Sequence, residues 1–67
     1  MTSVVRFAVE GGIFGVGRLA TRLNGLEKAN QIGPWHVGHW VDYNHRAIRI
    51  HFLSVADGKL AKLACAS

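Results

Sequence analysis

A chain of 67 residues with a single cysteine, Cys65, has to fold around one small apolar core without an internal disulfide bond. Hydrophobic residues make up 49% of the chain, which argues against a disordered segment and is a high share for so little interior volume. We therefore expect one folded domain spanning residues 1–67. We also expect part of its apolar surface to be covered by a second copy in a homodimer.

The first half of the chain has the pattern of a strand followed by a helix. Residues 3–9 alternate between apolar and other side chains, which predicts a strand that ends at the glycine pair 11–12. Apolar residues at helical spacing over 16–26 then predict an amphipathic helix. Gly33–Pro34 cannot continue a helix, so the helix has to end before it.

The second half begins with the pattern of a β-hairpin. Residues 36–43 and 46–53 both have strand character, and the two residues between them suit a tight turn. A two-residue turn places Val37 opposite Phe52 and leaves one face mostly apolar. The segment Ser54–Asp57 then matches a capping box, in which a hydroxyl is followed three residues later by an acid, and predicts the start of a second helix.

The order strand, helix, strand, strand, helix predicts an α+β fold. We expect a βαββα two-layer sandwich with a three-stranded antiparallel sheet in the order 1-3-2 and both helices on one face. This architecture resembles a ferredoxin-like fold without its last strand. The first strand then lies at an edge of the sheet, where a second copy of the chain can add its own strand.

The other face of the predicted sheet is uncovered and mixes basic and aromatic side chains. The predicted hairpin places Trp40 opposite Arg49 on this face, which allows a cation–π contact. An aromatic ring among basic groups suits either the stacking of unpaired bases or a protein contact, including a dimer interface in which Trp40 anchors face-to-face packing. The candidate binding face consists of Arg6, Trp40, Arg49 and His51.

The charge balance favours anionic partners. Eight Lys and Arg residues stand against four Asp and Glu residues, for a formal net charge of +4. Some of this charge forms basic strips on the two predicted helices, where it is either solvated or in contact with phosphates or with an acidic protein surface. The candidate phosphate contacts are Arg18, Arg22, Lys59 and Lys62.

Two further patterns suggest ligands but lack the context that the ligands need. Gly15-x-Gly17-x-x-Ala20 has the spacing of a dinucleotide-binding turn, yet no parallel second strand follows it, so we expect no cofactor. The sequence leaves open whether the turn over 11–17 holds an anion. His36 and His39 would point to opposite faces of one strand, so we expect no metal site.

These features favour a small non-catalytic binding module. We expect it to inhibit or scaffold a partner protein or nucleoprotein through the open sheet face and the edge strand, for example as an accessory inhibitor encoded by a phage or mobile element. Binding of single-stranded DNA or RNA is the alternative. A third hypothesis is a metal-independent ribonuclease toxin, which leaves an enzymatic role open and would use His51, Arg49, Arg6 and Tyr43.

The sequence also indicates where such a module acts. The start of the chain lacks the pattern of a secretory signal, and its longest apolar stretch is far shorter than a membrane span. A lone cysteine is typical of a reducing compartment. We therefore expect a cytoplasmic protein that does not act at a membrane.

Overall fold

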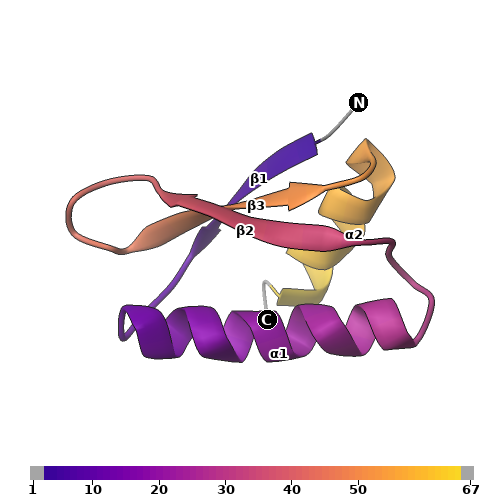
Figure 1. Cartoon of the computed structure of the whole chain (residues 1–67), viewed down its shortest axis with the longest axis horizontal. Coiled ribbons are helices and arrows are strands. Elements are labelled where there is room, and N and C mark those ends of the chain that lie inside the picture. The colour runs from indigo at the N-terminus through magenta and orange to yellow at the C-terminus, as the bar shows by residue number, and fades with distance from the viewer. Residues whose placement is uncertain (1–2, 66–67) are drawn as a thin grey trace.

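The computed structural model describes residues 3–65 and contains the five expected elements in the expected order. The sheet is antiparallel with the strand order β1-β3-β2, which confirms the predicted α+β fold (Figure 1). No helix within this range is long and apolar enough to cross a bilayer. The elements are β1 (Ser3–Ala8), α1 (Ile13–Lys28), β2 (Trp35–Trp40), β3 (Ala47–Phe52) and α2 (Val55–Cys65).

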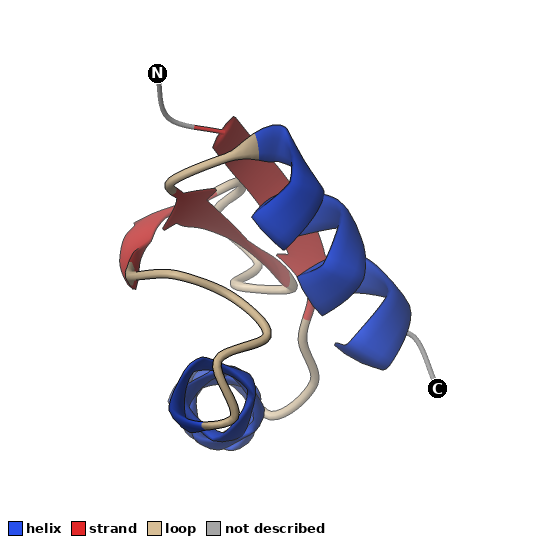
Figure 2. Ribbon diagram, turned by 90° about the vertical axis from the view of Figure 1, so that its right-hand side faces the viewer, coloured by secondary structure: helices blue, strands red, loops and turns tan. Residues whose placement is uncertain are grey.

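The core lies between the sheet and the two helices (Figure 2). The central strand β3 contributes every second side chain to it, and its three core residues are each at most 3% exposed. Leu19 and Leu23 of α1 and Ala61 of α2 close the core from the helix side. The period of two that predicts a half-buried strand is thus kept along β3, whose buried residues are Ile48, Ile50 and Phe52.

A glycine-rich turn joins β1 to α1. Gly11 and Gly12 have φ angles of 82° and 58°, in the left-handed region that favours glycine. Gly15 is buried, and a Cβ atom on it would lie 2.2 Å from the carbonyl oxygen of Glu10. These three glycines therefore allow a sharp turn and a close approach of α1 to the end of β1.

The register of the β2–β3 hairpin differs from the predicted one. Val37 lies opposite Ile50, and Phe52 faces Trp35, which is the first residue of β2. The register then shifts between Val37 and Trp40, as it does at a β-bulge. The hairpin thereby brings both tryptophans of the chain against the core, which the predicted register would not have done.

The loop of this hairpin is longer than the predicted two-residue turn. The strands end at Trp40 and resume at Ala47. Within the loop, the Asp42 carboxylate accepts a hydrogen bond of 3.1 Å from the Asn44 backbone N–H, and His45 adopts a φ of 55°. Asn44 and His45 thus lie in the turn as predicted, but an Asx turn at Asp42 makes the loop longer than two residues.

The edge of β1 is capped by a lysine from α2. The Val9 backbone N–H donates to the Arg46 carbonyl oxygen. In an antiparallel ladder such hydrogen bonds recur at every second residue, so the backbone N–H and C=O of Arg6, three residues earlier, point away from β3. Lys62 Nζ donates a hydrogen bond to that outward Arg6 carbonyl, and it lies 4.9 Å from the centre of the Phe7 ring. A charged side chain that covers the edge of a sheet opposes the addition of another strand.

Replacing Lys62 with alanine is therefore expected to promote association through β1. The freed Arg6 carbonyl would gain a hydrogen bond from an added strand, and one such bond corresponds to about 1 kcal/mol, or about fivefold in the dimerisation constant. Sedimentation velocity over a range of concentrations measures this constant. Lys59→Ala removes the same charge from α2 and is expected to leave it unchanged. Equal association of wild type and Lys62→Ala would contradict a guarding role for Lys62.

Candidate functional site

The sheet face turned away from the helices combines arginines and histidines with small side chains. The pairing register assigns to it alternate residues of all three strands. None of these residues is acidic, and none is a phenylalanine, tyrosine or tryptophan. We call this surface the open face, and it consists of Val4, Arg6 and Ala8 of β1, His36 and Gly38 of β2, and Ala47, Arg49 and His51 of β3.

Two arginines lie directly opposite each other on the open face. Arg6 of β1 and Arg49 of β3 are partners in the antiparallel ladder, and both side chains are exposed. Like charges at directly opposite positions of a sheet repel each other and lower its stability. The open face carries no carboxylate that would offset this repulsion. An anion from outside the chain is the natural counterpart of the pair.

Two histidines stack beside the arginine pair. The rings of His36 and His51 are 4.6 Å apart between centroids and nearly parallel, with an angle of 6°. The His51 ring also packs over Gly38, where an added Cβ would lie only 2.7 Å from His51 Nε2. The predicted register placed Gly38 opposite His51, so sequence reasoning missed that His36 is the residue that pairs with His51. A glycine inside a strand was the available signal, since it often marks a close approach.

The placement predicted for Trp40 is wrong. Trp40 lies opposite Ile48 rather than Arg49. It packs against the core, and the centroid of its ring is 4.6 Å from that of the His45 ring. The register shift in β2 turns its side chain to the helix side of the sheet. The expected cation–π contact with Arg49 is therefore not formed. Arg6, Arg49 and His51 lie together on the open face as predicted.

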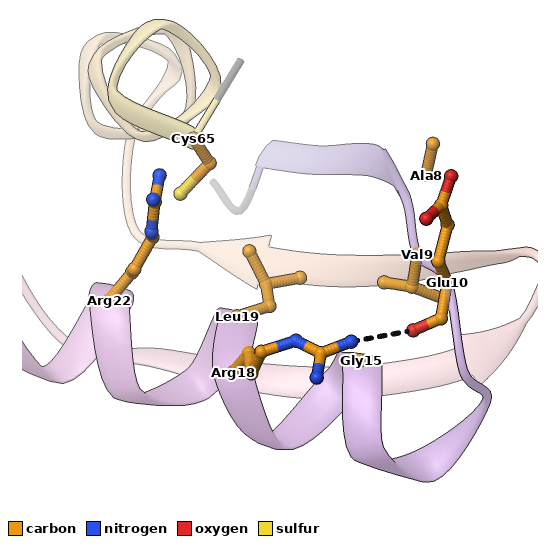
Figure 3. Close-up of a pocket in the computed structure, with 8 residues that line it drawn as sticks. All are labelled: Ala8, Val9, Glu10, Gly15, Arg18, Leu19, Arg22 and Cys65. Atoms are coloured by element: carbon orange, nitrogen blue, oxygen red, sulfur yellow. Dashed lines mark hydrogen bonds between the residues drawn. The ribbon is translucent and has the colours of Figure 1, made fainter. Parts of the chain in front are cut away.

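The four helix cations do not form one surface. Arg18 and Arg22 line a cleft between α1, the end of β1 and the end of α2 (Figure 3). Lys62 instead reaches the edge of β1, and Lys59 is exposed on α2. These positions divide the predicted phosphate contacts into an arginine pair at the cleft and two separate lysines.

Two backbone N–H groups of the glycine-rich turn are paired within the turn itself. The backbone N–H groups of Phe14 and Val16 donate to the carbonyls of Gly11 and Gly12. The sheet over residues 3–65 is antiparallel, so the parallel strands of a dinucleotide-binding domain are missing there. Gly15 serves packing against Glu10 rather than ligand approach.

Of the four residues in the ribonuclease hypothesis, Arg6, Arg49 and His51 share the open face, whereas Tyr43 lies apart from them. Tyr43 lies in the hairpin loop with a fully exposed side chain. His51 lies near the far end of β3, four residues beyond its first residue Ala47, which corresponds to about 13 Å along a strand. Among residues 3–65, no group of three or more His, Cys, Asp or Glu side chains is placed to hold a metal ion.

The chain matches no known protein family, and comparisons with curated proteins and with solved structures also give no match. The open face is therefore characterised by its own chemistry. It offers two guanidinium groups, each with five N–H donors in a planar fork, and two imidazole rings. This donor set binds carboxylates or phosphates.

Proposed function

We propose that the protein is a non-catalytic binding module that inhibits or scaffolds a partner protein by covering an acidic surface of it with the open face. The pairing of Arg6 with Arg49 on a face without carboxylates carries this proposal. A partner with two carboxylates removes the repulsion between the guanidinium groups and gains charge-assisted hydrogen bonds.

The side chains around the arginine pair favour a protein over single-stranded nucleic acid. Unpaired bases bind by stacking on exposed aromatic rings, and Trp40 lies on the other side of the sheet. His36 and His51 stack on each other rather than offering two separate platforms. Ala8 and Ala47 lie opposite each other and allow a flat partner surface to approach closely.

The arginine pair also argues against self-association through this face. Two copies packed open face to open face would bring two Arg6–Arg49 pairs together, and like charges across an interface oppose binding. The open face is thereby left for a different, acidic protein. The expected homodimer would have to use another surface and stays a prediction.

A charge-matched variant pair tests the proposed function. We expect a fluorescent glutamate-rich peptide to bind the wild type, and we expect Arg6→Gln with Arg49→Gln to weaken binding about tenfold or more, which is about 1.4 kcal/mol or more. Lys28→Gln with Lys59→Gln removes the same charge from the helices and is expected to change the affinity far less. Fluorescence anisotropy at physiological salt measures both.

Two outcomes of this titration would overturn the proposal. Equal weakening by the two variant pairs would show attraction by net charge alone. Tighter binding of a single-stranded oligonucleotide than of the peptide, lost in the Arg6→Gln, Arg49→Gln protein, would assign the open face to nucleic acid instead.

A further inference from the structure

A second basic site lies on the helix side of the molecule, away from the open face. It is an open cleft of about 370 Å³ between the end of β1, the first half of α1 and the end of α2 (Figure 3). Leu19 and Val9 are buried and form part of its apolar lining. The polar groups at the cleft belong to Arg18, Arg22, Glu10 and Cys65.

Two backbone carbonyls hold the arginines at the cleft. Arg18 Nη2 donates to the Glu10 carbonyl oxygen over 3.2 Å, and Arg22 Nη1 donates to the Ala64 carbonyl oxygen over 3.4 Å. Each guanidinium has five N–H donors, so most of the donors are left for another acceptor. The two side chains are thus oriented by the fold before any ligand arrives.

The positive charge of this pair is not matched within the cleft. Arg18 and Arg22 are one helical turn apart, a spacing at which like charges repel. Among residues 3–65, Glu10 is the one acidic residue that lines the cleft. Figure 3 shows that Arg18 reaches the main-chain carbonyl of Glu10, while the Glu10 carboxylate points away from both guanidinium groups.

The Cys65 thiol lies at the same cleft. Its Sγ atom projects from α2 toward the space beside Arg22 and Leu19 (Figure 3). Burial raises the pKa of the Cys65 thiol, and the charges of Arg22 and Lys62 only partly oppose this. The thiol is therefore mostly protonated near neutral pH, so Cys65 serves as a reporter of cleft occupancy rather than as a nucleophile.

We propose that this cleft binds a phosphorylated small molecule, with the phosphate held between Arg18 and Arg22 and the rest of the ligand against Leu19 and Val9. The planar guanidinium fork matches the geometry of phosphate oxygens. The cleft volume lies at the lower end of the range of about 300–1,000 Å³ for small-ligand sites. This site is separate from the proposed function of the open face and does not depend on it.

Alkylation of Cys65 by uncharged iodoacetamide tests the proposal with inorganic pyrophosphate as the probe. At constant ionic strength, millimolar pyrophosphate is expected to slow alkylation several-fold and in a saturable way. The bound anion shields the thiol, and its negative charge disfavours the thiolate. Arg18→Gln with Arg22→Gln is expected to abolish this protection, whereas Lys28→Gln with Lys59→Gln should retain it.

Side-chain NMR of the unmodified protein keeps the test valid if the arginine variant folds poorly. The Nε–Hε signals of Arg18 and Arg22 are expected to shift together with pyrophosphate, with the same midpoint as the alkylation rate. An unchanged alkylation rate and unmoved arginine signals would overturn the site. Protection that persists in the Arg18→Gln, Arg22→Gln protein, or that comes from an oligonucleotide but not from pyrophosphate, would also overturn it.

Discussion

Replacing Phe52 with alanine is expected to destabilise the fold by about 3–5 kcal/mol. Phe52 is 1% exposed and lies at the end of the central strand, opposite Ser3 of β1 and Trp35 of β2. Its ring lies 6.1 Å from the Phe7 ring, between centroids. Truncation therefore opens a cavity bordered by several elements at once. About 0.05–0.15 kcal/mol per residue is typical of native proteins, so this loss approaches the whole stability of so small a chain.

Urea denaturation followed by circular dichroism measures this loss. Phe14→Ala is the matched control, because Phe14 is 77% exposed and its truncation is expected to change stability by no more than about 0.5 kcal/mol. Similar losses for the two variants would mean that Phe52 is not at the centre of the core in solution.

Replacing Gly15 with alanine is expected to cost about 3 kcal/mol, at the upper end of the range for overpacking. The new Cβ would lie 2.2 Å from the Glu10 carbonyl oxygen, so the backbone at the start of α1 has to move. The same carbonyl accepts the hydrogen bond from Arg18, and a shift there also disturbs the arginine cleft.

Gly17→Ala is the control for this substitution. A Cβ on Gly17 meets nothing within 4 Å, so alanine there is expected to raise stability by up to about 1 kcal/mol through its helix propensity. Thermal unfolding of the two variants against wild type measures opposite shifts in Tm. A gain in stability for both would show that α1 does not approach Glu10 closely in solution.

The sequence predicted the start of the second helix better than the end of the first. The first half of the capping box is confirmed, because Ser54 Oγ accepts a hydrogen bond of 3.2 Å from the Asp57 backbone N–H, while the Asp57 carboxylate accepts one of 3.0 Å from the Gly33 backbone N–H. The first helix ends at Lys28, five residues before the Gly33–Pro34 pair that was expected to stop it. Asn30 adopts a φ of 59°, so an asparagine in the left-handed region ends the helix before the Gly33–Pro34 signal is reached.

The open face could be predicted from β1 and β3 but not from β2. Alternation places Arg6, Arg49 and His51 on one side of the sheet, since neither of those strands contains an irregularity. The β2 strand shifts its register between Val37 and Trp40, and such a shift leaves no mark in the alternation of apolar residues. The observed β2–β3 register packs both tryptophans against the core. This packing involves residues from several elements, so it cannot be inferred from the sequence of β2 alone.

Mapping the acidic-peptide titration by NMR tests the role of the open face most directly. We expect the side-chain signals of Arg6, Arg49 and His51 to shift with one common dissociation constant, while those of Lys28 and Lys59 stay in place. Shifts that centre on the helix cations and leave the Arg6 and Arg49 signals unmoved would contradict the account.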